Sequence, residues 1–277
     1  MCGFIGLTGG QDCAADIILG LQALQHRGQD SAGITTMVAT GTRFNARRGL
    51  GTAERALTSS DLEALPGPIG IGHVRYPTQG LGVLDDAQPF FYRQPGVLMA
   101  HNGNFTNVFA MHDLLREDSV HLLSRCDVEP VLCLFALALM QQRRRDHTTE
   151  DALAALVNTL KRATGAYSIV IAMILDGEET LLAVRDPHGL RPAVWGSLGE
   201  SRIVASESVA LDALNARLEG DVAPGEALIL RRNKPPRRFQ LFEPQPAPCV
   251  FEYIYFARPD STMNGRSVYH ERMVLGR

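Results

Sequence analysis

The sequence of 277 residues is 45% hydrophobic and 21% charged, which is the composition of an ordinary globular protein with one large domain or two smaller ones. Its net charge of -3 excludes a strong electrostatic attraction to nucleic acid, and no apolar run is long enough to cross a membrane. The N-terminus lacks a basic segment followed by an apolar one, so we expect a cytoplasmic protein that binds neither nucleic acid nor a membrane.

The first half of the chain alternates short helices and strands. Apolar residues recur at helical spacing within residues 14–28, and Gly28 is placed to end that helix. Strand-like composition, with a glycine at one end, marks three segments, 32–39, 69–76 and 96–103.

Two helices are predicted next. The segment 127–145 is apolar nearly all round, which indicates a buried helix, and its basic end, Arg143 to Arg145, is interpreted as solvated. The segment 148–165 has one apolar face and begins with Thr148 or Thr149 as a cap, followed by acidic residues.

From Tyr167 onward the pattern is one of strands joined by tight turns. The predicted strands are 167–175, 180–186, 202–206 and 226–232, and the last leads into a polar hairpin loop, "RRNKPPRR". Consecutive strands with short turns indicate antiparallel pairing. We therefore expect an α+β fold with two antiparallel sheets packed together and helices on the outer faces. The segment 241–249 is the only stretch that resembles a linker.

The positions of the cysteines suggest a catalytic nucleophile rather than a disulfide framework. The five cysteines are scattered and lack CxxC spacing, which argues against disulfides and a zinc site. Cys2 follows the initiator methionine, so removal of Met1 would give it both a thiol and a free α-amino group. With ordinary pKa values of about 8.5 and about 7.7–8.0, the amine can take the thiol proton near neutral pH. Taken alone, a Met-Cys start can also be accidental.

A nucleophile that attacks an amide needs hydrogen-bond donors for the oxyanion. The stretch "AHNGNFTN" offers the side-chain amide of Asn102 and the backbone N–H of Gly103. The alternative is an Asn-Gly turn that closes a hairpin, which is the commoner meaning of this dipeptide.

A small polar substrate also needs charged anchors. Arg75 and Thr78, in "GHVRYPTQG", suit a carboxylate, because a guanidinium donates two parallel hydrogen bonds. Asp127 suits an ammonium group, although an acidic residue before a helix can also act only as a helix N-terminal charge. Arg27 lies in "QHRGQDSAG", a turn that is unusually rich in polar groups.

Together, these stretches resemble a known family. "MCGFIGLTGG", "ALQHRGQDSAGI", "IGIGHVRYPTQG", "AQPF" and "AHNGNFTN", in this order, are similar to the class II glutamine amidotransferase domain, an N-terminal nucleophile hydrolase. Later stretches, among them "AVRDPHGLRPAVWG", "VASESVALDAL" and "CVFEYIYFARPDS", resemble the amidophosphoribosyltransferase branch of that family. The resemblance extends over essentially the whole chain.

The resemblance implies a four-layer αββα sandwich and a glutaminase mechanism. Cys2 would attack the side-chain amide of glutamine, form a thioester and release ammonia. Asn102 and Gly103 match the oxyanion hole, and three residues match the grip on the glutamine backbone groups: Arg75, Thr78 and Asp127. Arg27 matches a residue of the loop beside the nucleophile. Three residues depart from the family pattern at the start of the second helix region: Cys126, Val128 and Pro130.

The resemblance also implies a partner. Residues 2–240 would form the amidotransferase domain and residues 241–277 a connector toward a phosphoribosyltransferase domain that this chain lacks. That domain or subunit would use the ammonia and phosphoribosyl pyrophosphate to make 5-phosphoribosylamine, the first step of purine synthesis. Mg²⁺ is expected only there, and we expect no cofactor or metal in this chain. We also expect a homo-oligomer.

Two alternatives remain open from the sequence. The chain can be a stand-alone amidase that acts on another amide, or a regulatory module that binds glutamine without turnover. Turnover of glutamine, of other amides, or of neither distinguishes the three hypotheses.

Overall fold

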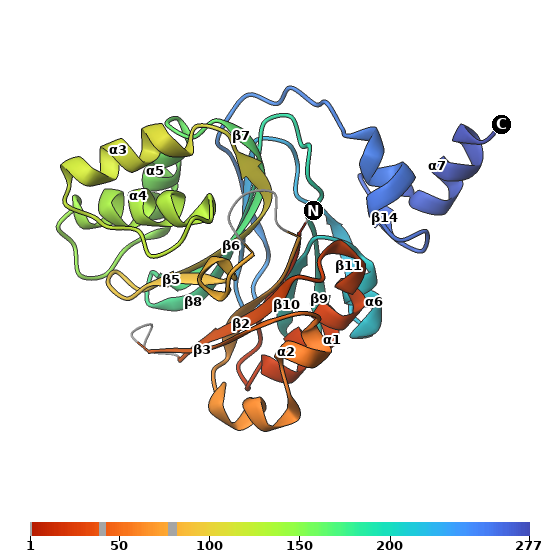
Figure 1. The fold of residues 1–277 in the computed structure, drawn as a ribbon, viewed down its shortest axis with the longest axis horizontal. Helices are drawn as coiled ribbons and strands as arrows, with labels where there is room; N and C mark the ends of the chain where they lie inside the picture. The colour runs from red at the N-terminus through yellow and green to blue at the C-terminus, as the bar shows by residue number, and fades with distance from the viewer. Residues whose placement is uncertain (1, 39–42, 77–81) are drawn as a thin grey trace.

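The computed structural model describes residues 2–38, 43–76 and 82–277, which form four layers. Two antiparallel sheets lie face to face in the middle, and helices cover the outer face of each sheet (Figure 1). This is the αββα sandwich that the sequence predicts. No helix within the described residues is long and apolar enough to span a membrane.

The first sheet contains the N-terminal strand at its centre. Among the described residues its order is β11-β9-β10-β1-β4-β2-β3. The bounds are β1 Gly3–Thr8, β2 Ser31–Met37, β3 Phe44–Leu50, β4 Ile69–Arg75, β9 Val194–Leu198, β10 Ser201–Ala205 and β11 Arg217–Asp221. Because β1 pairs with both β4 and β10, the residue before β1 is held from two sides.

The second sheet has the order β13-β12-β8-β7-β6-β5 within the described ranges. Its strands are β5 Phe90–Tyr92, β6 Val97–Phe105, β7 Gly165–Leu175, β8 Glu178–Arg185, β12 Glu226–Leu230 and β13 Arg237–Gln240. The predicted polar hairpin loop connects β12 to β13. The strands predicted at 32–39, 69–76, 96–103, 167–175, 180–186, 202–206 and 226–232 are therefore confirmed, with small shifts of their ends.

Side chains that alternate along the strands contribute to two hydrophobic cores, one between the two sheets and one between a sheet and its helices. On β7, Val170 and Ala172 point into the layer between the sheets, whereas Ile169 and Ile171 point toward the helices. Side chains of a strand alternate between faces, and here both faces are covered. This explains why β7 is apolar without interruption, "YSIVIAMIL", instead of alternating apolar and polar residues.

Helices α1 Ala14–Ala23, α2 Ala53–Ala56 and α6 Val209–Ala213 pack on the first sheet. The predicted helix over 14–28 is too long, because α1 ends at Ala23 and a 3₁₀ turn, η1 Gln25–Arg27, follows. Gly28 lies in an extended conformation after this turn. An added Cβ there would be 2.5 Å from the backbone of Arg75, so the close approach of two chain segments requires glycine.

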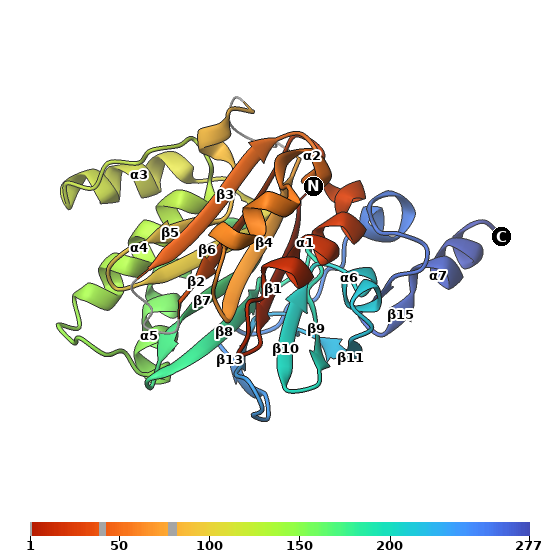
Figure 2. The same cartoon turned by 90° about the horizontal axis from the view of Figure 1, so that it is seen from below.

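Helices α3 Val108–Glu117, α4 Val128–Met140 and α5 Thr149–Leu160 cover the second sheet (Figure 2). The two predicted helices of this region are confirmed, and Arg143 to Arg145 are exposed after the end of α4. Thr148, rather than Thr149, caps α5 through a capping box with Asp151. Pro130 lies in the first turn of α4, where backbone N–H groups have no partner within the helix.

The residues after β13 form a separate C-terminal segment at the edge of the sandwich (Figures 1 and 2). A stretch without helix or strand, 241–249, leads to a π-helix, η4 Glu252–Phe256. A small hairpin, β14 Thr262–Met263 and β15 Arg266–Ser267, and helix α7 Val268–Leu275 follow. Two short helical turns complete the described elements, η2 Ser59–Ala64 and η3 Leu84–Asp86.

Candidate active site

Cys2 lies where the two sheets face each other. It precedes β1 of the first sheet, and its backbone nitrogen donates to Oδ1 of Asn102, on β6 of the second sheet, at 3.3 Å. Its Sγ lies 3.6 Å from the carbonyl oxygen of Tyr76. Residues that are 100 positions apart in the sequence are thus brought into contact at the start of the chain.

Asn102 presents an unused donor at the same place. Its Nδ2 is buried and has no hydrogen-bond partner within the part of the chain that the structure describes. Because Oδ1 is engaged by the nitrogen of Cys2, the amide orientation leaves the N–H groups of Nδ2 available. A buried donor without a partner costs about 1–3 kcal/mol, which is compensated when a ligand oxygen accepts from it. Nδ2 is therefore a donor suited to an oxyanion.

The backbone of Asn102 and Gly103 is extended, because β6 continues to Phe105. The alternative interpretation as an Asn-Gly hairpin turn is therefore wrong. At Gly103 an added Cβ would lie 2.2 Å from the carbonyl oxygen of Ala166 on β7, so no side chain fits. The glycine lets the backbone of the two strands pair closely beside the nucleophile.

Burial changes the acid–base balance of the nucleophile. Cys2 is 6% exposed, and desolvation raises the pKa of its thiol above the ordinary value. The sequence suggested that a thiol and an amine with ordinary pKa values would suffice. In this buried position the thiolate is disfavoured relative to the thiol.

Asp127 is held as a carboxylate beside the strands. Burial alone would raise its pKa, but His101 and the backbone N–H of Phe105 outweigh this effect and the pKa of Asp127 is lowered. Oδ2 accepts from Phe105 N at 2.8 Å and lies 3.3 Å from Nε2 of His101. The side chain of Asp127 does not cap α4. It contacts His101 and Phe105 of β6 instead.

Arg75 ends β4 and is almost completely buried. A guanidinium nitrogen lies 3.7 Å from Oδ2 of Asp86, whose Oδ1 accepts from the backbone N–H of Arg125 at 2.8 Å. Asp86 thus connects the end of β4 to the segment that precedes Asp127. The predicted substrate residue Thr78 lies outside the described residues.

Arg27 makes its contacts with the protein itself. Nε donates to the carbonyl oxygen of Cys2 at 3.0 Å, and the two terminal nitrogens bond to Glu207 and to Glu252. The side chains of Arg27 and Glu207 are completely buried. Arg27 therefore holds the backbone of the nucleophile through a buried ion-pair cluster that also contains the C-terminal segment.

Comparisons with known proteins agree with this geometry. A family model described as a glutamine amidotransferase domain matches residues 81–213. The chain is 40% identical over 289 residues to the amidophosphoribosyltransferase of Escherichia coli strain K12, covering all of this chain and 55% of that protein. The chain belongs to the glutamine amidotransferase family.

Solved structures place it in the amidophosphoribosyltransferase branch. The glutamine phosphoribosylpyrophosphate amidotransferase from B. subtilis, complexed with ADP and GMP, has a TM-score of 0.84 and 31% identity, with 99% of this chain and 57% of that chain covered. A structure described as the allosteric regulatory enzyme of purine biosynthesis has a TM-score of 0.86 and 32% identity, with the same coverage. This amidotransferase chain spans about half the length of the relatives that it matches.

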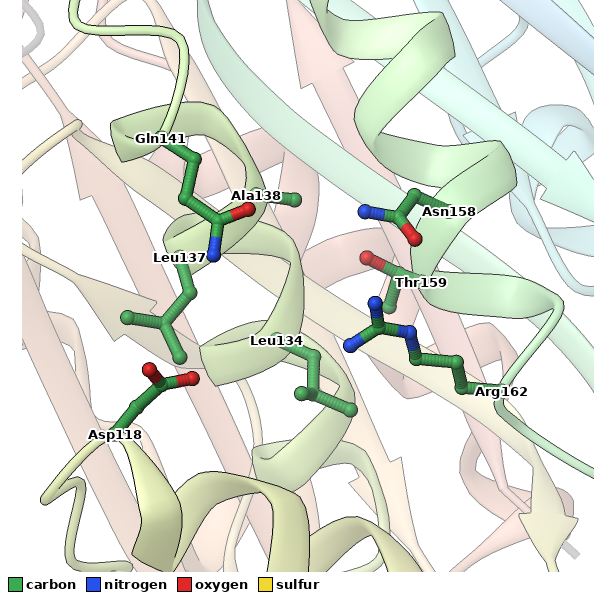
Figure 3. Close-up of a pocket in the computed structure, with 8 residues that line it drawn as sticks. All are labelled: Asp118, Leu134, Leu137, Ala138, Gln141, Asn158, Thr159 and Arg162. Carbon is green, nitrogen blue, oxygen red and sulfur yellow. The ribbon is translucent and has the colours of Figure 1, made fainter.

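Other hollows of the amidotransferase fold lie away from the nucleophile. The pocket between α4 and α5 in Figure 3 has a volume of about 20 Å³, which is room for a single water molecule. It is lined by residues such as Asn158 of α5, Gln141 just after α4 and Arg162 just after α5, and contains no part of the site described above. Within the described residues, no group of three or more His, Cys, Asp or Glu side chains is arranged to hold a metal ion.

The structure adds several residues that the sequence analysis did not select. They are His73, Asp86, Gln88, His101, Glu207 and Glu252, and all of them are buried polar residues. All of them except Asp86 lie in stretches that carry the family resemblance, namely "IGIGHVRYPTQG", "AQPF", "AHNGNFTN", "VASESVALDAL" and "CVFEYIYFARPDS". Their roles depend on partners that are far away in the sequence, so spacing along the chain gave no signal.

Proposed function

We propose that this chain hydrolyses the side-chain amide of glutamine, with Cys2 as the nucleophile after removal of Met1. The sulfur attacks the amide carbon while the α-amino group of Cys2 takes the thiol proton. When the C–N bond breaks, that proton passes to the leaving nitrogen, which departs as ammonia. Water then hydrolyses the thioester, which yields glutamate and restores the thiol.

The observation that carries this proposal is the double role of Asn102. Its Oδ1 accepts from the nitrogen of Cys2, which supports that nitrogen as the base, and its buried Nδ2 is available to the oxyanion. One such donor is typically worth about 10²–10³ in rate. The backbone N–H of Gly103 is proposed as the second donor.

The charged anchors suit the two ends of an amino acid. Asp127, a carboxylate with a lowered pKa, would hold the α-ammonium group of glutamine, and Arg75 with Thr78 would hold its α-carboxylate. Arg27 is proposed as a positioning residue, because its guanidinium contacts Cys2 and two glutamates of the protein.

The ammonia is proposed to serve a phosphoribosyltransferase half, as the names of the relatives imply. That half would transfer it to phosphoribosyl pyrophosphate, with Mg²⁺, to make 5-phosphoribosylamine for purine synthesis. Exposed apolar side chains of the C-terminal segment give such a partner a surface, namely Val250, Phe251, Ile254, Tyr255, Tyr269, Met273, Val274 and Leu275. A homo-oligomer is part of the same proposal.

Release of glutamate from glutamine tests the proposed function. Cys2→Ala is expected to abolish release, because it removes the sulfur on which the thioester is proposed to form, whereas Cys249→Ala is a control in a half-buried loop cysteine. Mass spectrometry of the same samples is expected to give the mass without Met1. Unchanged release by Cys2→Ala, a retained Met1 in active protein, or turnover of other amides but not glutamine would refute the proposal.

A further inference from the structure

We propose that Gln88 is a positioning residue that keeps His101 neutral, with its proton on Nε2, so that Asp127 retains a full negative charge for the ammonium group of the substrate. This inference rests on the proposed function, because it concerns how the same site recognises glutamine. The supporting observation is a series of hydrogen bonds from Gln88 through His101 to Asp127, in which the direction of the first bond is unambiguous.

That donor is the backbone N–H of His101. It bonds to Oε1 of Gln88 at 2.8 Å, and a backbone N–H can only donate, so the oxygen of the Gln88 amide is identified. The other end of the amide must then be Nε2, which lies 3.1 Å from Nδ1 of His101 and 3.6 Å from Sγ of Cys126. Gln88 is buried, and all three of its polar contacts are made within the protein.

The orientation of Gln88 determines the protonation of the ring. Nε2 of an amide only donates, so Nδ1 of His101 must accept and cannot carry a proton. The single ring proton is therefore on Nε2, which faces Oδ2 of Asp127 at 3.3 Å. A neutral His101 ring thus donates one hydrogen bond to the carboxylate of Asp127.

The net charge of the His101–Asp127 pair follows from this arrangement of hydrogen bonds. A neutral His101 leaves Asp127 with a net charge of -1, whereas an imidazolium at the same distance would cancel it. The ring has little freedom to turn, because it is buried and stacks on Phe105 with centroids 5.4 Å apart. The other ionisable groups near this pair are Arg75, the thiols of Cys2 and Cys126, and His73, whose Nε2 donates to the carbonyl of His101 at 3.1 Å; Sγ of Cys126 lies 3.8 Å from Oδ1 of Asp127. Burial lowers the pKa of His73 to about 3, so His73 is neutral as well.

The matching variant is Gln88→Glu, which has the same shape. A carboxylate at this position accepts both from the backbone N–H and from a protonated Nδ1, so it favours a doubly protonated His101. Gln141→Glu adds the same charge at the exposed end of α4 and is the control. Both variants are made in the Cys2→Ala chain, where glutamine binding is measured by calorimetry without turnover.

The state of the ring is read from ¹⁵N chemical shifts of labelled histidine, with His101 assigned by the loss of its signals in His101→Asn. We expect a proton only on Nε2 in the parent chain and on both nitrogens in Gln88→Glu. Glutamine binding is expected to weaken about tenfold or more in Gln88→Glu, because a charge-assisted contact becomes a neutral one. Binding by Gln141→Glu is expected to be unchanged.

A proton on Nδ1 of the parent chain, or a doubly protonated ring with unchanged binding, would overturn the inference. The carboxyl group introduced by Gln88→Glu can itself be protonated, and it then mimics the amide of Gln88. In that case a singly protonated His101 ring with unchanged glutamine binding supports the same dependence of binding on the state of the ring. Should Gln88→Glu fail to fold, the position of the ring proton of His101 in the parent chain tests the inference. Because neither measurement requires turnover, a chain that binds glutamine without hydrolysing it refutes the proposed function but leaves this inference intact.

Discussion

Asn102 joins the two chemical tasks of the proposed reaction in one side chain. In that proposal its carbonyl oxygen would orient the nitrogen of Cys2 as the base, and its amide nitrogen would donate to the oxyanion. Both tasks require a buried amide with one end engaged and the other available. A residue that binds only substrate would not need the contact with Cys2.

Substitution of Asn102 by alanine is therefore expected to lower kcat for glutamine hydrolysis by about 10²–10³. The KM should change little, because the donor contacts the oxygen that becomes charged in the transition state. Steady-state glutaminase assays measure both values. Asn158→Ala removes an asparagine of α5 that lies outside the site and is the control, and an Asn102→Ala variant with a normal kcat would contradict the assigned role.

Single residues of the site were accessible from the sequence only where a motif contained them. Cys2, Asn102 and Gly103 stand in quoted stretches, and the structure brings these three residues together. The contacts among these and other buried polar residues were not accessible in this way. Gln88 and His101 are 13 positions apart and meet through the turn before β5, which no periodicity in the sequence describes.

At the scale of elements, α5 is the helix whose beginning the sequence specifies best. The backbone N–H of Asp151 donates to Oγ1 of Thr148 at 3.2 Å, and the carboxylate of Asp151 accepts from Thr148 N at 2.9 Å. Two of the N–H groups that a helix start leaves without partners are thereby satisfied.

Thr148→Ala is expected to lower the free energy of unfolding by about 1 kcal/mol, because it removes one side of the capping box. Urea unfolding followed by circular dichroism measures the loss. Thr148→Ser keeps the hydroxyl and is expected to lose less than half as much. Equal losses in the two variants would show that packing of the threonine methyl group, rather than capping, stabilises this position.

Three strands that the sequence did not predict, β3, β11 and β13, share one feature. Strands β3, β11 and β13 are rich in charged residues and mostly half-buried or exposed, for example "FNARRGL" in β3. Their backbones are ordered by pairing with a neighbouring strand rather than by an apolar pattern of their own. Edge strands of this kind are therefore difficult to recognise from composition.

At the scale of the whole molecule, Glu207 ties the sandwich to the C-terminal segment. It bonds to His26 and Arg27 of the turn beside the nucleophile, and it accepts from Arg258 N at 3.0 Å and from Ser261 Oγ at 2.5 Å. Burial by itself raises the pKa of Glu207, but these partners outweigh it, Arg27 most strongly. The pKa of Glu207 is lowered from 4.5 to about 2.

A lowered pKa means that the unfolded state binds the proton more tightly, so Glu207 stabilises the fold above pH 4.5 and loses this effect as the pH falls toward 2. At pH 7 we expect Glu207→Gln to lower the free energy of unfolding by about 3 kcal/mol, because Arg27 loses a buried partner. The difference from the parent chain should narrow between pH 4.5 and pH 2. Urea unfolding at several pH values measures it, and a difference independent of pH would contradict the prediction.

The sequence by itself determined the chemistry and the layers. A cysteine after the first methionine, an Asn-Gly dipeptide and apolar strands with short turns depend on residue type and local order. Only the tertiary structure decided which side chains meet: Asn102 with Cys2 across the two sheets, and Arg27 with Glu207 and Glu252. These contacts join residues 100, 180 and 225 positions apart. They form because packing buries polar groups that must then find partners, wherever the chain brings them.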